Sequence, residues 1–231
     1  MSLSMPEIRA CLFDLDGVLV DTAKYHYIAW KETADSLGIP FDEHDNELLK
    51  GVSRKGSLEF ILNKGRQSKS ENEIEHLLES KNSLYLKLVS DMTPEEVLPG
   101  VRRFLEELKA QGIKIALGSA SKNAQLILDK CELSGLFDAI VDGRHCTHSK
   151  PHPEVFEKGM KALGSYPTET VVFEDAISGI IAGNRAGCFT IGVGEKDVLK
   201  EADAVIEGFK DYTPKHLFSL LSSASKSKII A

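Results

Sequence analysis

Several features that mark specialised classes of protein are missing from this sequence. It has four cysteines, and no two of them form a Cys-x-x-Cys pair. No apolar run approaches the roughly 20 residues that cross a bilayer, and the first residues lack the apolar core of a secretory signal. The net charge is −7 and there is no long basic run. These absences argue against a disulfide framework, a membrane protein and a nucleic-acid-binding protein, and they favour the reducing cytoplasm.

What is present is the composition of an ordinary globular protein, with 42% hydrophobic and 27% charged residues. After an apolar run from Ile8 to Phe13, which predicts a short buried strand, the pattern is helical for about seventy residues. From Thr93 onward, helical and strand patterns alternate, which predicts a mostly parallel sheet with helices on both faces. We therefore expect a Rossmann-like α/β core of residues 1–19 and 93–231, and an inserted all-helical cap (lid) domain of residues 20–92.

Within the cap we expect helices near 22–36, 42–49, 53–63 and from 70 onward, the last one with a Ser70-x-x-Glu73 capping box. An apolar stripe on this last helix, which includes Leu84, predicts bundle core. In the α/β core we expect strands at 114–117, 139–141, 170–173, 189–193 and 204–206. The expected helices there are 101–110, 123–130, 153–163, 177–186 and 214–221. The linkers at 19–21 and 91–94 would then act as a hinge.

Two carboxylates, Asp14 and Asp16, stand where the first expected strand ends, and Gly17 lets the backbone turn sharply after them. Ligands of parallel α/β sheets bind outside the carboxyl ends of the strands. The turn can redirect one carboxylate, so that one attacks or holds a metal while the other moves protons. The alternative is a solvated turn or a helix cap, which suits Asp21 and Thr22 better than Asp14.

Phosphate- and metal-binding residue types follow three further expected strands. Residues 118–123, Gly-Ser-Ala-Ser-Lys-Asn, let amides and hydroxyls approach a phosphate, or else simply cap the next helix. Lys150 can neutralise a carboxylate nucleophile and a phosphate oxygen together, although a lone lysine is more often a surface residue. Glu174 and Asp175 offer hard oxygen ligands suited to Mg²⁺, or a cap for the following helix. Four such motifs at four strand ends favour a catalytic site.

A histidine-rich loop surrounds Lys150. It holds His145, Cys146, His148 and His152, which are residue types that bind zinc. Their spacing is not that of a zinc finger, so we interpret the cluster as a polar loop with incidental histidines.

With these motifs in place, the chain resembles the haloacid-dehalogenase-like superfamily along its whole length. The pattern is Asp-x-Asp at the first strand, then Ser119, Lys150 and the pair Glu174-Asp175. Dehalogenases proper lack the second aspartate, so the presence of Asp16 points to phosphoryl transfer. Within the superfamily, residues 13–18, 21–31, 49–54 and 116–123 are similar to the β-phosphoglucomutase family, and the cap motifs are the more specific part of that resemblance.

The resemblance implies roles for individual residues. Asp14 would be the nucleophile and Asp16 the general acid and base, with Thr22, His26 and Lys81 as further catalytic residues. Mg²⁺ would be held by Asp14, the backbone carbonyl of Asp16, Glu174 and Asp175. The residues that would bind phosphate or substrate are Trp30, Gly51, Val52, Ser53, Arg54, Ser119, Ala120, Ser121, Lys122, Asn123 and Lys150.

The activity that this resemblance implies is interconversion of β-glucose 1-phosphate and glucose 6-phosphate, through an aspartyl phosphate and a bisphosphate intermediate. Such an enzyme is an Mg²⁺-dependent intramolecular phosphotransferase of the isomerase class. Its partner would be a small phosphorylated hexose, with no nucleic acid and no membrane, and we expect a monomer because a lid must swing. The alternatives are a sugar-phosphate phosphatase on the same fold and a non-catalytic phosphosugar-binding module.

Overall fold

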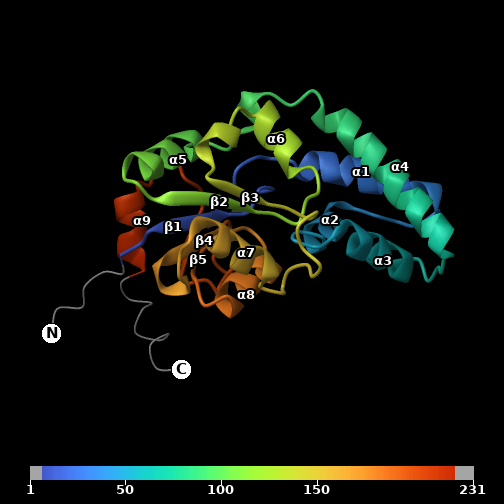
Figure 1. Cartoon of the computed structure of the whole chain (residues 1–231). Helices are drawn as coiled ribbons and strands as arrows, with labels where there is room; N and C mark the ends of the chain where they lie inside the picture. The colour runs from blue at the N-terminus through green and yellow to red at the C-terminus, as the bar shows by residue number, and fades with distance from the viewer. Residues whose placement is uncertain (1–6, 222–231) are drawn as a thin grey trace.

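The computed structural model describes residues 7–221 and is built around one six-stranded parallel sheet (Figure 1). The strands lie in the order β3-β2-β1-β4-β5-β6, and every pairing is parallel. Their bounds are β1 Ala10–Phe13, β2 Lys114–Gly118, β3 Ala139–Val141, β4 Thr170–Glu174, β5 Phe189–Val193 and β6 Ala204–Ile206. The expected α/β sheet is confirmed, with strand bounds that differ from the predicted ones by two residues at most.

Helices cover both faces of the sheet because successive strand residues point to opposite sides. Phe13 joins one hydrophobic cluster with α5 (Val101–Ala110), α6 (Ala124–Lys130) and α9 (Pro214–Leu220). Its neighbour Leu12 joins the other, with α7 (Glu154–Leu163) and α8 (Ile177–Arg185). Residues on each strand therefore alternate between two buried faces, which explains the near-continuous apolar runs in the sequence.

Four helices between β1 and β2 form a group with a hydrophobic cluster of its own. They are α1 (Ala23–Ser36), α2 (Glu43–Leu48), α3 (Arg54–Lys64) and α4 (Glu71–Val89). Trp30, Phe41, Leu58 and Ile61 are buried among them. Figure 1 shows the group beyond the carboxyl ends of the strands, on the side where β1 leads into α1. The division into domains 1–19 with 93–231 and 20–92 stays a prediction.

The two chain segments that join these helices to the sheet run side by side. Val20 and Val97 form an antiparallel bridge, and the Leu98 N–H donates to the Leu19 carbonyl at 2.9 Å. Glu96 then binds the start of α1, since its two carboxylate oxygens accept from Lys24 and Tyr25, both at 2.8 Å. The predicted linkers are thus paired with each other; their role as a hinge stays a prediction.

Three short 3₁₀ helices, Pro94–Glu96, Ser134–Leu136 and Pro167–Glu169, were not expected, because one turn is too short to give a periodic pattern. The capping box of Ser70 and Glu73 is confirmed. The apolar stripe of α4 is only partly buried, and the fully buried positions of this helix are Lys81, Tyr85 and Val89. No helix in residues 7–221 combines the length and apolar character needed to cross a bilayer.

Candidate active site

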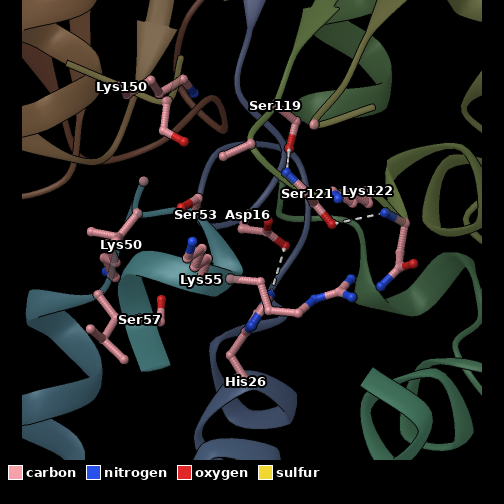
Figure 2. Close-up of a pocket in the computed structure, with 18 of the residues that line it drawn as sticks. Asp16, His26, Lys50, Ser53, Lys55, Ser57, Ser119, Ser121, Lys122 and Lys150 are labelled. Atoms are coloured by element: carbon pink, nitrogen blue, oxygen red, sulfur yellow. Dashed lines mark hydrogen bonds and ion pairs between the residues drawn. The ribbon is translucent and has the colours of Figure 1, made fainter. Parts of the chain in front are cut away.

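The loops at the carboxyl ends of β1, β2, β3 and β4 meet the four-helix group around one cavity of about 580 Å³. Figure 2 shows Ser119 and Lys150 entering it from the sheet side, opposite His26, Ser53 and Lys55 from the helical side. All the predicted site residues line the cavity except Thr22 and Glu174, and those two contact residues that do. The sequence motifs therefore converge in space.

A buried ion-pair cluster forms the floor on the sheet side. Lys150 Nζ lies 2.5 Å from Asp14 Oδ1 and 2.5 Å from Glu174 Oε1. Burial lowers the pKa of Lys150, but Asp14 and Glu174 outweigh it, so the pKa is raised and the ammonium stays charged. Burial and the nearby charge of Asp14 raise the pKa of Glu174 to about 7, against the lowering effect of Lys150. Lys150 is thus no surface lysine, and it holds two carboxylates together.

Asp175, next to this cluster, is reached by a lysine from the helical group. Lys50 Nζ lies 3.3 Å from Asp175 Oδ2, and burial together with the charges of Glu174 and Asp14 raises the pKa of Asp175. Gly17 has φ +78, and a Cβ there would collide with the Asp175 carboxylate. Glycine at this position is therefore required both by the turn and by the close approach of the acid.

The donor chemistry of this corner fits Mg²⁺. Asp14, Glu174 and Asp175 offer hard carboxylate oxygens, and burial together with the neighbouring carboxylates raises the pKa of the latter two, an effect that a bound cation would oppose. Glu174 does not cap α8 with its side chain in the usual way. Its Oε2 accepts the Ala176 N–H at 3.0 Å, which fixes the carboxylate at the base of the site.

The second carboxylate of the first motif, Asp16, points away from Lys150 and toward α1. The Thr22 hydroxyl donates a short hydrogen bond to Asp16 Oδ1. His26 Nε2 lies 3.9 Å from the same oxygen, and Figure 2 shows His26 below Asp16. Thr22 occupies the N-cap position of α1, yet its side chain does not cap the helix, so that expectation was wrong because Asp16 competes for the hydroxyl. Burial and the charge of Asp14 raise the pKa of Asp16 to about 6.

Cationic side chains of the helical group face Asp16 across the cavity. Lys81 Nζ lies 3.2 Å from His26 Nδ1 and 4.6 and 4.5 Å from the ring centroids of Trp30 and Tyr85. Burial and the charge of Arg54 lower the pKa of Lys81 to about 7. Burial, Lys81 and Arg54 also lower the pKa of His26. Within residues 7–221, neither Arg54 nor Lys81 forms an ion pair, so this side of the cavity can take an anion.

The loop after β2 is shaped by its own serines. Ser119 Oγ accepts the Ser121 N–H at 3.1 Å, and Ser121 Oγ accepts the Asn123 N–H at 3.2 Å. Asn123 in turn donates to Asn82 of α4 at 3.0 Å, a contact between the sheet side and the helical side. Ala120 and Lys122 line the cavity beside them. Gly51, Val52 and Ser53 line it from the loop before α3, where Ser53 caps the helix.

Sequence reasoning missed three contributors to the site. Tyr85 and Asn82 lie in α4 outside any motif, and the motif at residues 49–54 does not indicate a partner for Lys50. The approach of the helices to the sheet gives Lys50 and Asn82 their partners, whereas Tyr85 contacts Lys81 of its own helix. Residues 49–54 carried the one signal that could have pointed to Lys50. Of the histidine-rich loop, His145 contacts Asp142, whereas His148 and His152 stack on each other with ring centroids 4.5 Å apart.

Comparison with known proteins agrees with this geometry. The family model for haloacid dehalogenase-like hydrolases matches residues 8–187. A β-phosphoglucomutase from Bacillus subtilis (strain 168) is 43% identical over 89% of this chain and 92% of its own length. A phosphorylated carbohydrates phosphatase from Thermotoga maritima is 30% identical over 87% and 91%. The crystal structure of a β-phosphoglucomutase from Clostridium difficile superposes with a TM-score of 0.91 at 40% identity, covering 95% of this chain and 99% of that one. The chain belongs to the haloacid dehalogenase-like hydrolase family.

Proposed function

We propose that the protein is a β-phosphoglucomutase, an Mg²⁺-dependent phosphotransferase that interconverts β-glucose 1-phosphate and glucose 6-phosphate. The observation that carries the proposal is the pair of carboxylates in two different environments. Asp14 is paired with Lys150, whereas Asp16 is turned toward Thr22 and His26 with its pKa raised to about 6. One carboxylate is suited to attack phosphorus and the other to exchange a proton near neutral pH.

In the proposed reaction, Asp14 starts as an aspartyl phosphate. A free hydroxyl of the bound sugar phosphate attacks its phosphorus while the Asp16 carboxylate takes the hydroxyl proton; a P–O bond to the sugar forms, the P–O bond to Asp14 breaks, and a sugar bisphosphate results. After the bisphosphate has turned over, an Asp14 oxygen attacks its other phosphorus, so that a P–O bond to Asp14 forms and the P–O bond to the sugar breaks, and protonated Asp16 gives its proton to the departing sugar oxygen. Lys150 and Ser119 would hold the transferring phosphoryl group, since both line the cavity next to Asp14.

Mg²⁺ would be held by Asp14, Glu174, Asp175 and the backbone carbonyl of Asp16. When bound, it would neutralise charge on the transferring phosphoryl oxygens, which is the usual contribution of a cation to phosphoryl transfer. The Lys150 ammonium supplies a second, permanent positive charge at the same place.

The helical side would bind the other phosphate. Arg54 and Lys81 have no ion pair within residues 7–221, and Lys122 and Asn123 line the cavity from the loop after β2. A bidentate arginine grip on a remote phosphate can drive closure of residues 20–92 as a lid over the sheet side. Closure would exclude water, which a mutase needs because water would otherwise hydrolyse the aspartyl phosphate.

The test follows two products at once. Purified protein is mixed with Mg²⁺, β-glucose 1-phosphate and a trace of glucose 1,6-bisphosphate, and glucose 6-phosphate and inorganic phosphate are measured together, with the α-anomer as the control. We expect glucose 6-phosphate from the β-anomer with little free phosphate. Free phosphate as the main product would instead make the protein a sugar-phosphate phosphatase, the activity in the printed name of the Thermotoga maritima relative.

A further inference from the structure

The loop that carries Lys150 holds a second group of metal-ligand side chains, apart from the acidic corner formed by Asp14, Glu174 and Asp175. His148, His152 and Glu154 each offer a ligand atom, and these atoms all lie within 4.8 Å of one another. The two imidazole rings stack with an interplanar angle of 25°. Glu154 is the first residue of α7. We propose that His148, His152 and Glu154 form a surface site for a divalent transition-metal ion such as Zn²⁺, separate from the Mg²⁺ site.

The spacing of the ligand atoms supports this proposal. His148 Nδ1 and Glu154 Oε2 lie 3.2 Å apart. Two ligands that are each about 2.0–2.1 Å from a tetrahedral Zn²⁺ lie roughly 3.3 Å from each other, so an ion can replace the proton shared by these two atoms. His152 Nδ1 accepts the Glu154 N–H at 3.2 Å, so an ion bound through this nitrogen would take the place of that hydrogen bond.

Glu154 is held in place for this role. Its Oε1 accepts from Lys158 Nζ at 2.5 Å, and its Oε2 accepts the His148 N–H at 2.7 Å. The Lys158 hydrogen bond and the two backbone donors of the loop lower the pKa of Glu154 to about 2, so the group is ionised at neutral pH. The carboxylate is therefore a preorganised anion that lies beside two imidazoles.

The ligand types favour a transition metal over Mg²⁺. Two imidazole nitrogens and one carboxylate are typical of Zn²⁺, Ni²⁺ and Cu²⁺ sites, whereas Mg²⁺ prefers oxygen. Both histidines are exposed, so solvent can complete the coordination. His148 and His152 lie two residues before and after Lys150, and an ion bound to both would join the two ends of the turn that positions this lysine.

The experiment uses untagged protein in excess Mg²⁺, which occupies the acidic corner, and titrates Zn²⁺ calorimetrically. We expect one Zn²⁺ per chain, with affinity about tenfold weaker or worse in His148→Ala and in His152→Ala. His145→Ala is the matched control, because His145 is an exposed histidine of the same loop that contacts Asp142 instead; it should bind like the unchanged protein. Thermal unfolding with Zn²⁺ should show a rise in Tm that both cluster variants lose.

The proposal is overturned if no Zn²⁺ binds in excess Mg²⁺, or if the double variant His148→Ala/His152→Ala binds as well as His145→Ala. Circular dichroism of each variant shows that it is folded, and Glu154 is left intact because its carboxylate also holds the loop backbone. The readout is ion binding and not turnover, so failure of this proposal is distinguishable from failure of the mutase assignment.

Discussion

Two buried lysines face the same cavity from opposite sides, and they differ in almost everything but burial. Lys150 is 6% exposed and Lys81 is 3% exposed. Lys150 touches two carboxylates, and they raise its pKa in spite of burial. Lys81 touches His26 and two aromatic rings, and burial with the charge of Arg54 lowers its pKa to about 7. On the sheet side, Lys150 is paired with carboxylates, whereas Lys81 on the helical side forms no ion pair within residues 7–221.

The different environments of Lys150 and Lys81 indicate different roles for the two sides of the cavity. On the sheet side, the Lys150 ammonium holds Asp14, the proposed nucleophile, in place before substrate arrives. On the helical side, two cations lie close together without a counter-ion among the described residues, an arrangement that a bound phosphate would stabilise. Under the proposed function, a substrate phosphate bound there would supply free energy for closure of the helices over the sheet.

The largest expected effect concerns the carboxylate between the two sides. Asp16→Asn should lower turnover by about 100- to 10,000-fold, because it removes the group that exchanges a proton with the sugar. It should also raise Tm at pH 7–8. The folded-state pKa of about 6 lies above the ordinary value of 3.8, so ionisation of Asp16 costs stability, progressively as pH rises from about 4 to 6 and fully above 6. Thermal unfolding at several pH values measures this gain, which should shrink toward pH 4. A turnover equal to that of the unchanged enzyme would remove Asp16 from the mechanism.

Substitution of Lys150 tests how much its ion pairs with Asp14 and Glu174 stabilise the fold. Lys150→Met should destabilise the fold by about 3–5 kcal/mol, because it leaves Asp14 and Glu174 buried without their shared cation. Turnover should fall by roughly 100- to 1,000-fold, the usual cost of one lost charge stabiliser. Urea unfolding gives the first number and the coupled assay the second. Mg²⁺ should restore part of the lost stability, since it neutralises the same carboxylates; unchanged stability in metal-free buffer would contradict the comparison.

The same substitution on the helical side should act in the opposite direction on stability. The pKa of Lys81 lies below its ordinary value, so its charge costs stability at pH 7, and Lys81→Met should stabilise the free protein by about 1–3 kcal/mol. The kcat/KM should fall by about 10- to 100-fold because a phosphate ligand is lost. Substrate binding at pH 7–8 should take up protons in the unchanged enzyme as Lys81 becomes fully charged. Calorimetry in buffers of different ionisation enthalpy measures this uptake, and the variant should show less.

Local signals in the sequence explain why the fold could be predicted. Helix α5 and strands β3, β5 and β6 have the predicted bounds, since an apolar period or a short β-branched run bounded by turns identifies each of them. Ser70 caps α4 through bonds to Glu73, which is close in sequence. The convergence of Asp14, Ser119, Lys150 and Glu174 followed from one geometric rule, that parallel strands end at the same edge.

Contacts between the helices and the sheet could not be predicted in this way. Nothing near Lys50 in the sequence indicates Asp175 as its partner, 125 positions away, and no periodicity places Lys81 at a buried position. Thr22 was one of two residues that could cap the first helix, but the competing acceptor Asp16 approaches it only once the chain has turned. Each of these depends on how two separately packed groups approach each other, which local patterns do not encode.

The smallest expected effect concerns Lys50, a lysine that reaches from the helical side to the carboxylate of Asp175. Lys50 Nζ lies 3.3 Å from Asp175 Oδ2, on a carboxylate that would also bind Mg²⁺. Lys50→Met should therefore tighten the apparent affinity for Mg²⁺ by about two- to tenfold, because a competing positive charge is gone. Lys55→Met is the matched control, since Lys55 lines the same cavity but forms no ion pair within residues 7–221. Mg²⁺ titration of activity compares the two variants. If the two variants have equal apparent affinity for Mg²⁺, the charge of Lys50 does not influence Mg²⁺ binding at Asp175.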